Sequence, residues 1–388
     1  MLALIEWEFS QLIMKIALLI QRFPGGGAEN YVKEIATRLY KKGKDVTVIT
    51  SENKDFDDSK YDFRIIRLPS SIKIGEYFVW NGLEKILEQE RFDVIHTNTY
   101  GYYHSDKVAR LKKKLGYKLV MTSHGFTGMD LHKLKKEKII KQSSLFDFLR
   151  DLYDEKIGKK TLLTCDHLIA LSQYDLDFYK KIGVDESKIN VIPPGISDIF
   201  FEENVSKLDL KGDPMLLSVG QLSWIKNQKM IIHAIPDLLK HKPNAHLYLI
   251  GSDGGEFVNL ENLCKNLNVD THVTFLGSKK NHEVYSYMKS ADLLLQTSFA
   301  EGLSTVLLES LSLGLQFITT PAGGNAHLTN IGIGLVVPFN DHDSLFQKIL
   351  ELLDDSNNLQ KMKISTTTLA SNYSWSAIFP KILKLYEN

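Results

Sequence analysis

Two glutamates that lie eight positions apart give this sequence its clearest sign of chemistry. Glu301 stands in a glycine turn and Glu309 within an apolar run, in the stretch EGLSTVLLE. Gly302 to Ser304 are expected to open a helix, whose free N–H groups and positive dipole end favour a phosphate. Glu309 then lies two turns further on, facing the same cleft. Because buried carboxylates are rare unless they are bonded, Glu309 is expected to meet ligand hydroxyls, a lysine or a backbone group.

A lysine at a second strand-to-helix turn would suit the same anion. Lys226 lies in GQLSWIKNQKM (220–230), which follows a strand-like run and precedes a helix-like one. A lone lysine is usually solvated surface, whereas a lysine in a cleft beside a helix N-terminus can neutralise a diphosphate. Spacing alone leaves both a structural and a ligand-binding interpretation open, since buried ion pairs also perturb carboxylates.

The elements that would position these residues are buried parallel strands. Apolar runs rich in Val, Ile and Leu alternate with stretches of helical period, which is typical of a parallel sheet covered by helices. The first unit has a strand at KIALLI (15–20), a helix that Gly43 stops, and a strand at VTVIT (46–50). Its helix is predicted by the apolar spacing of Val32, Ile35, Ala36 and Leu39. Further strands are expected at FRIIRL, DVIHT, KLVMTS, HLIAL and INVI.

A second series of the same kind follows a polar segment that ends near Pro214. Its strands are expected at MLLSVG, HLYLIG, HVTFLG, DLLLQTS, QFITT and GLVV. The prediction is therefore an α/β protein with two doubly wound domains, whose ligand lies in a cleft at the carboxyl ends of the strands. The expected parts are an N-terminal extension (1–13), a first domain (14–197), a second domain (198–372) and a C-terminal helix (373–388) that packs back on the first domain.

Charge is unevenly spread over a chain whose formal net charge is zero. Residues 107–141 hold 11 basic residues, and the surrounding stretch from Asp106 has only three acids. Tyr117, Phe126, Met129 and Leu131 are interleaved with these cations. The segment is either a solvated face or a docking surface for an anionic membrane. A nucleic-acid partner is not expected, because no nucleic-acid module is visible.

Cysteine usage and hydropathy bear on the compartment. Cys165 and Cys264 are the two cysteines and have neither a disulfide framework nor a metal-ligand spacing. No run approaches the roughly 18 apolar residues of a membrane span, and the N-terminus has no basic leader. We expect a cytoplasmic protein, either free or peripheral on the inner face of the membrane.

The order of these stretches resembles the retaining, nucleotide-sugar-dependent glycosyltransferases of the GT-B fold, of the family 4 type. That family includes bacterial lipopolysaccharide, capsule and phosphatidylinositol mannosyl enzymes. The similarity covers nearly the whole chain, through PGGGAEN, SHG, IALSQYD, VIPPGI, GQLSWIKN, LIGSDG, FLG, EGLSTVLLE, TTPAGGNA and YSWSAI. It implies two facing Rossmann-like domains with a cleft between them.

The resemblance also implies a role for each candidate residue. Glu301 would contact the donor sugar, Glu309 the nucleotide ribose, and Lys226 the diphosphate without a metal. His124, in SHG, would meet the transferred sugar from the first domain, although a histidine taken alone is more often an ordinary buried residue. His124, Glu301 and Lys226 form the predicted catalytic set. The other predicted contacts are Gly26, Gly27, Gln221, Gly302, Leu303, Ser304 and Thr305 for the donor diphosphate and sugar, and Gly251, Leu276 and Gly277 for the ribose and base.

Two positions depart from the pattern of the family. Gln221 stands where many members have an arginine, and His327 stands where many have an acid. Hydrogen bonds to charged groups contribute about 1.5–3 kcal/mol against roughly 1 kcal/mol for neutral ones, so diphosphate binding is expected either to be weaker or to use another cation such as Arg22. His327 is interpreted as donor tuning.

The reaction implied by the resemblance is transfer of a hexosyl or acetylhexosaminyl group, with retention, from a nucleotide sugar to an acceptor hydroxyl. A UDP-sugar is favoured over a GDP-sugar from the EGLST form, and the acceptor is a saccharide or a lipid-linked glycan in cell-envelope polysaccharide synthesis. No metal or other cofactor is expected, because the DxD-like stretches at 55–57, 175–177 and 341–343 suit surface or capping acids. A GT-B nucleotide-sugar epimerase and a degenerate nucleotide-sugar-binding protein stay open as alternatives.

Overall fold

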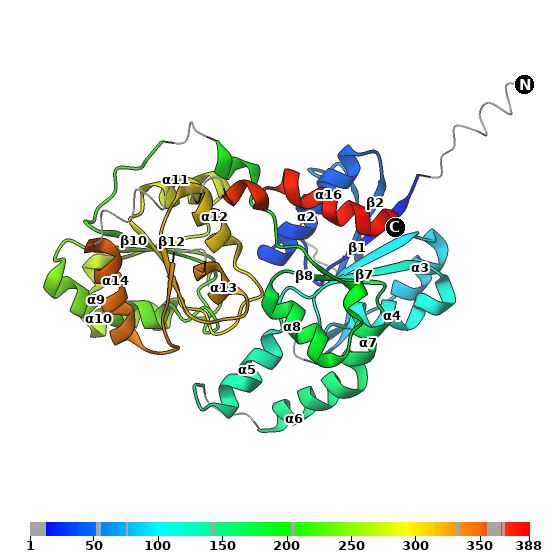
Figure 1. The fold of residues 1–388 in the computed structure, drawn as a ribbon, viewed down its shortest axis with the longest axis horizontal. Coiled ribbons are helices and arrows are strands. Elements are labelled where there is room, and N and C mark those ends of the chain that lie inside the picture. Colours follow the sequence, from blue (N-terminus) through cyan, green and yellow to red (C-terminus); the bar gives the residue numbers. More distant parts are fainter. Residues whose placement is uncertain are drawn as a thin grey trace, which may run out of the picture.

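The computed structural model describes residues 13–51, 56–74, 77–140, 144–202, 206–330, 334–354, 366 and 369–388. These residues form two α/β domains that lie side by side (Figure 1). The first domain has a seven-stranded sheet in the order β3-β2-β1-β6-β7-β8-β9, and the second a six-stranded sheet in the order β12-β11-β10-β13-β14-β15. Every strand pair in both sheets is parallel. The predicted fold class, two Rossmann-like doubly wound domains, is confirmed.

Each predicted strand of the first domain is present. The strands are β1 (Lys15–Leu19), β2 (Asp45–Ser51), β3 (Arg64–Leu68), β6 (Val94–Asn98), β7 (Lys118–Thr122), β8 (His167–Ala170) and β9 (Ile189–Val191). The helices are α2 (Gly27–Lys41), α3 (Leu83–Glu90), α4 (Tyr103–Leu115), α5 (Thr127–Lys136), α6 (Ser144–Tyr153), α7 (Lys159–Thr164) and α8 (Gln173–Ile182), with a π-helical turn at Asp154–Gly158 between α6 and α7. An antiparallel hairpin of β4 (Ser70–Ile74) and β5 (Tyr77–Trp80) is also present and is not among the predicted strands.

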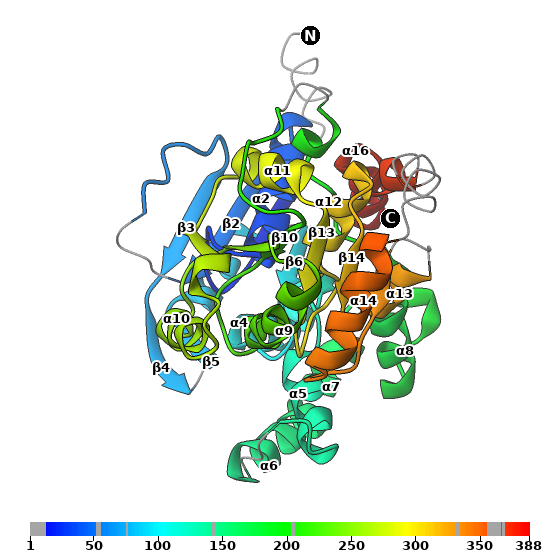
Figure 2. The same cartoon turned by 90° about the vertical axis from the view of Figure 1, so that its left-hand side faces the viewer.

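The second domain repeats the scheme. Its strands are β10 (Met215–Val219), β11 (His246–Ile250), β12 (Val273–Gly277), β13 (Leu293–Gln296), β14 (Phe317–Thr319) and β15 (Gly334–Val336). Its helices are α9 (Gln228–His241), α10 (Phe257–Asn266), α11 (Asn281–Ser290), α12 (Thr305–Leu313), α13 (Asn325–Thr329) and α14 (His342–Asp354). Figures 1 and 2 show α9, α10 and α14 on one face of this sheet and α11 and α12 on the other. The described part of the chain contains no helix that is long and apolar enough to cross a bilayer.

The last helix, α16 (Trp375–Glu387), lies beside α2 on the first domain (Figure 1). Its buried face, which includes Trp375, Ile378 and Ile382, joins the same apolar cluster as the β1 residue Leu18. Burial of apolar surface contributes roughly 25 cal/mol per Å² to stability, so these large side chains hold the helix on the first domain. The chain therefore crosses from the second domain back to the first at its end.

The two domains touch through backbone at the loops that follow β7 and β13. A Cβ on Gly302 would lie 2.9 Å from Gly125 N, and one on Gly125 would lie 2.7 Å from Gly302 N. Gly125 also has a positive φ of 93°, which favours glycine. A side chain at either position would push the loops apart, so these glycines set how closely the carboxyl ends of the two sheets approach.

Candidate functional site

A cavity of about 710 Å³ lies between the two domains at the carboxyl ends of their strands. Both domains line it, with the glycine loop and His124 on one side and Lys226 and Glu301 on the other. This edge is where parallel sheets present ligand-binding loops. Of the predicted residues, the cavity is lined by Gly26, Gly27, His124, Gln221, Lys226, Glu301, Gly302, Leu303, Ser304 and Thr305.

Lys226 and Glu301 form an ion pair inside this cavity. Lys226 Nζ lies 2.6 Å from Glu301 Oε1, and the Glu301 side chain is 12% exposed. Ser298 Oγ and Gln296 Nε2 donate to the same oxygen, at 2.7 and 3.2 Å. Burial acts to raise the pKa of Glu301, but the Lys226 charge and these hydrogen bonds outweigh it and hold the pKa below its usual value. Glu301 is therefore a fixed carboxylate whose other oxygen can face a ligand.

His124 is held rigidly opposite that pair. Its Nε2 lies 3.0 Å from Asn98 Oδ1, and the Tyr31 ring packs edge-on against the imidazole with centroids 4.9 Å apart. His124 has a positive φ of 54°, a conformation rare outside glycine, so the surrounding contacts must hold the loop in place here. Burial lowers the pKa of His124 to about 3, so the ring is neutral at physiological pH. With Nε2–H donating to Asn98, Nδ1 is free to accept a hydrogen bond.

The helix N-terminus beside the cavity differs slightly from the prediction. The helix α12 begins at Thr305, not at Gly302, because Ser304 has an extended conformation as the N-cap. The backbone N–H of Ser304 donates to Asn325 Oδ1 at 3.0 Å and is not available to a phosphate. The open N–H groups therefore start at Thr305, which also lines the cavity.

Glu309 lies in a neighbouring cavity of about 260 Å³ that shares the walls Gly25 to Gly27, Gln221 and Thr305 with the first. Gly251 lines this smaller cavity as well. Burial alone raises the pKa of Glu309 to about 8, and no hydrogen bond to its carboxylate is recorded among the described residues. A half-buried acid with no protein partner is costly when ionised, and ligand hydroxyls would satisfy it.

Three predicted positions lie outside both cavities. Leu276 and Gly277 do not line either one, although Gly277 O accepts from Gly251 N at 3.0 Å and the next residues, Ser278 and Lys279, do line the smaller cavity. The smaller cavity is therefore lined by the two residues that follow Leu276 and Gly277, and the base contact expected at Leu276 and Gly277 stays a prediction. His327 is exposed and lines neither cavity.

Arg22, the cation expected to compensate for the missing arginine at position 221, lies at the site. Arg22 and Gln221 both line the larger cavity. Arg22 lies near Glu29. Burial raises the pKa of Glu29, although hydrogen bonds from the N–H groups of Glu29 and Gly26 and the charge of Arg22 oppose this rise. Glu29 caps α2 at the third helical position, a spacing typical of a capping box. It orders the glycine loop that the donor would approach.

Sequence reasoning missed the residues that hold the site in place. Asn98, Ser298, Gln296, Asn325 and Glu29 each bond to a predicted residue or loop. Only the last had a usable signal, its position three residues after Gly26. The others are polar residues at strand ends whose partners lie elsewhere in the sequence, so no local pattern marks them.

The DxD-like stretches serve local structure where they are described. Asp175 accepts from Leu171 N at 2.8 Å, and Asp341 accepts from Ser344 N at 2.9 Å at the start of α14. Residue 55 of the first stretch lies outside the described residues. No cluster of three or more His, Cys, Asp or Glu side chains with metal-binding geometry occurs in the described ranges.

The basic segment 107–141 exposes fewer apolar side chains than predicted. Tyr117 and Phe126 are 5% and 1% exposed, so neither can contact a membrane, and the side chain of Met129 lies outside the described part. Three lysines are paired with acids of neighbouring helices and loops: Lys107 with Glu84, Lys112 with Asp166, and Lys114 with Glu84 and Glu88. The prediction that Tyr117 and Phe126 contribute apolar contacts to a membrane surface is wrong, because both rings pack in the core.

Both domains match glycosyltransferase families. Residues 200–368 match "Glycosyl transferases group 1" and residues 25–198 match "Glycosyltransferase Family 4". Alpha-monoglucosyldiacylglycerol synthase of Streptococcus pneumoniae is 28% identical over 324 residues, covering 79% of this chain and 69% of that protein. An N-acetyl-D-galactosaminyltransferase of Campylobacter jejuni, named for a glycan on PP-undecaprenol, is 26% identical over 96% of this chain and 98% of its own length.

The fold is also found in solved structures. HepE of Anabaena, in complex with UDP-glucose, has a TM-score of 0.74 to this chain, with 19% identity over 96% of this chain and 99% of that one. This similarity in fold extends over both domains.

Proposed function

Because this chain belongs to the GT-B glycosyltransferases of the family 4 type over both of its domains, we propose that it transfers a sugar, with retention, from a nucleoside diphosphate sugar to an acceptor hydroxyl. The observation that carries the proposal is the Lys226–Glu301 pair, which shares one interdomain cavity with His124 and the N-terminus of α12. A UDP-sugar is favoured over a GDP-sugar, and the complex of HepE with UDP-glucose supports testing UDP-sugars first.

The donor would lie across the two cavities. Glu309 would accept hydrogen bonds from the ribose in the smaller cavity, while the diphosphate would meet Lys226 and the N–H groups from Thr305 onward. Glu301 and the neutral His124 would then accept hydrogen bonds from hydroxyls of the sugar, from opposite sides.

Catalysis would rest on electrostatics and positioning. Lys226 and Arg22 would stabilise the negative charge that develops on the departing diphosphate, and the fixed Glu301 carboxylate would hold the sugar as it gains positive character. The acceptor would attack from the side of the leaving phosphate, which would take its proton. No step requires a metal or another cofactor.

The acceptor side contains a candidate membrane surface, made of α5, α6 and the π-helical turn after α6. Leu149, Leu152 and Ile157 are 48%, 44% and 36% exposed there. The exposed Lys133 and Lys136 lie on the neighbouring α5, and Figure 1 shows α5 and α6 projecting from the first domain. Leucines beside lysines suit an anionic membrane, with about 1 kcal/mol for each nearby basic residue. A saccharide or lipid-linked glycan is accordingly the proposed acceptor, and the inner membrane face the proposed location.

A thermal-shift panel of UDP, GDP, ADP and their common sugars, run with and without EDTA, tests the donor site. We expect one nucleotide series to stabilise the wild type equally in both conditions and not to stabilise Glu309→Ala. The panel is followed by incubation of the best donor with saccharide and lipid-linked acceptors and NMR of the products. Epimerised donor formed without an acceptor would identify an epimerase, and absence of any shift would leave a protein that has lost donor binding.

A further inference from the structure

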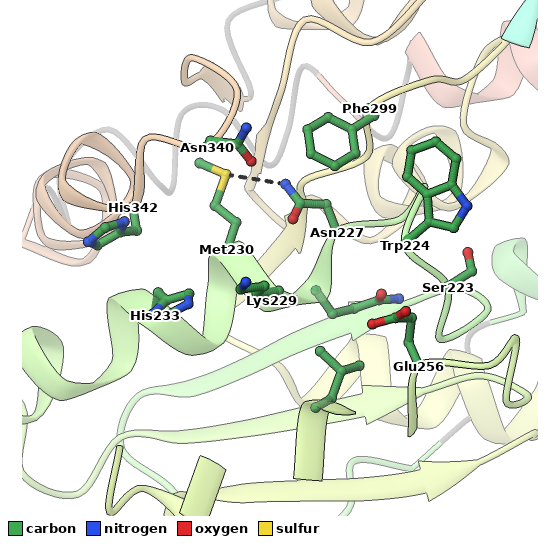
Figure 3. Close-up of a pocket in the computed structure, with 12 residues that line it drawn as sticks. Ser223, Trp224, Asn227, Lys229, Met230, His233, Glu256, Phe299, Asn340 and His342 are labelled. Atoms are coloured by element: carbon green, nitrogen blue, oxygen red, sulfur yellow. Dashed lines mark hydrogen bonds between the residues drawn. The ribbon is translucent and has the colours of Figure 1, made fainter. Parts of the chain in front are cut away.

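A third cavity, of about 490 Å³, lies in the second domain and shares no lining residue with the two donor cavities. It is formed by the loop before α9, the loop after β13, and the starts of α9, α10 and α14 (Figure 3). Its volume is within the range of small-molecule sites, roughly 300–1,000 Å³. None of the donor contacts proposed above involves this cavity.

One side of the cavity is an aromatic platform. Trp224 is 48% exposed, and its indole lies beside the Phe299 ring with centroids 6.3 Å apart. Figure 3 shows the two rings together on one side of the pocket, with His233 and His342 on the far side. An exposed tryptophan offers a flat apolar face and an N–H donor at its edge, which suits a ligand with alternating apolar and hydroxylated faces.

A buried acceptor without a partner lies in the same wall. Gln228 is 3% exposed, and its Nε2 donates to Gln221 O at 2.9 Å. Because that bond fixes the nitrogen side of the amide, Oε1 must lie on the other side, and it has no hydrogen-bond partner. Buried polar atoms are almost always bonded, so Oε1, in a residue that lines the cavity, is an acceptor that lacks its donor. Asn227 and Glu256 line the cavity with further hydrogen-bonding groups.

The charge of the lining favours a neutral ligand over a phosphate. Lys229 and Glu256 are its one lysine and one carboxylate, so their charges offset each other. Burial, together with the charge of Lys229, lowers the pKa of His233 and favours the uncharged form of that ring. The larger donor cavity differs, since the N-terminus of α12 opens onto it.

We propose that this cavity binds a neutral saccharide of one or two pyranose rings, stacked on Trp224 with a hydroxyl on Gln228 Oε1. Its walls belong to the loops that present Lys226 and Glu301 to the donor. Phe299 N donates to Ile225 O at 2.7 Å, and Thr297 Oγ1 donates to Asn227 O at 2.8 Å, so the two loops are bonded to each other between the sites. A bound saccharide therefore contacts the back of the catalytic loops.

Saturation-transfer NMR with maltose, sucrose and N,N′-diacetylchitobiose tests the proposal on the full chain. We expect transfer to at least one of these sugars in the wild type, and binding at least about tenfold weaker in Trp224→Ala and in Gln228→Met. The matched control is Val258→Ala, which removes another exposed apolar side chain of this domain that does not line the cavity. No transfer to any sugar, or equal binding by Trp224→Ala, would overturn the proposal. Nucleotide binding, followed separately by thermal shift, shows whether the variants are folded and whether the donor site stands independently.

The source of the saccharide is distinguished by inhibition kinetics. A sugar that raises the KM of the acceptor at unchanged kcat would assign the cavity to distal sugars of the acceptor. A change of kcat at saturating acceptor would assign it to a free saccharide that acts through the shared loops. Either pattern, lost in Trp224→Ala, supports the site, and inhibition that persists in that variant contradicts it.

Discussion

The substitution Glu309→Gln removes one charge from the smaller donor cavity while keeping the shape of the side chain. Burial raises the pKa of Glu309 from 4.5 to about 8. A group whose pKa is raised by folding stabilises the protein below its unfolded pKa, and that contribution is lost as the pH rises through the folded pKa. The gain in folding stability of the Glu309→Gln variant over the wild type should therefore grow between about pH 4.5 and pH 8 and then stay constant.

The magnitude follows from the same shift. At about 1.36 kcal/mol per pKa unit, the full shift corresponds to at most roughly 5 kcal/mol. Water in the open cavity screens the carboxylate, so we expect a gain in the free energy of unfolding of about 1–2 kcal/mol at pH 8.5 relative to pH 5. For a domain of this size that is roughly 2–8 °C in Tm.

Thermal unfolding of Glu309→Gln and wild type at pH 5 and pH 8.5 measures the effect. The control Glu261→Gln removes a charge from an exposed surface pair with Lys265. At pH 8.5, above the pKa of Glu309, Glu309→Gln should weaken UDP binding about tenfold or more, because an ionised acceptor of ribose hydroxyls becomes a neutral one. A Tm difference that is the same at both pH values would refute the burial argument, and unchanged UDP affinity would refute the ribose contact.

Further predictions concern the larger cavity and the interdomain contact. Lys226→Met should leave the Glu301 charge unpaired, which lowers the free energy of unfolding by about 3–5 kcal/mol if the carboxylate stays ionised, as measured by denaturant unfolding. The same substitution should lower kcat at least about 100-fold in steady-state kinetics. Because the pKa of His124 is lowered to about 3, its neutral form should persist from pH 5.5 to 8 and the kcat profile should have no inflection from it; an inflection near 6.5 that disappears in His124→Gln would contradict this. Gly302→Ala should impair closure and raise the donor KM, since its Cβ would lie 2.9 Å from Gly125 N, whereas Gly27→Ala meets nothing within 4 Å and should cost less.

A last prediction concerns the surface formed by α5, α6 and the turn after α6. Replacement of Leu149 and Leu152 by Ser should reduce co-sedimentation with anionic liposomes at low salt, whereas Phe201→Ser, another exposed apolar residue, should not. Binding that falls with added salt would fit the lysines of α5. Wild-type protein that binds no liposomes at any salt concentration would exclude the membrane surface.

The sheet could be predicted from sequence because strands buried on both faces are near-continuous apolar runs. Such runs identify β1 and β10 without knowledge of their partners. The hairpin of β4 and β5 was missed, since its residues SSIKI and YFVW have a mixed pattern, although Gly75 and Glu76 between them fit the Gly-X form of a two-residue hairpin turn. The start of α12 was set too early, because the extended Ser304 is held by Asn325, which lies 21 residues away.

The site itself was predictable only where a strand end meets a glycine turn. Glu301, Lys226 and Gly302 are found in such turns, and they line one cavity. The partners that fix their charge state and geometry, Ser298 among them, depend on how loops distant in sequence meet. The burial of Tyr117 and Phe126 likewise depends on tertiary packing, which composition cannot reveal.

The most direct test of the account is product formation by the wild type and Lys226→Met in the presence of EDTA, with the nucleotide sugar that gives the largest thermal shift. We predict that the wild type releases nucleoside diphosphate and forms a glycoside with the anomeric configuration of the donor, and that Lys226→Met binds the donor but forms product at least about 100-fold more slowly. A product of inverted configuration, or turnover that Lys226→Met leaves unchanged, would contradict the proposed role of the Lys226–Glu301 pair.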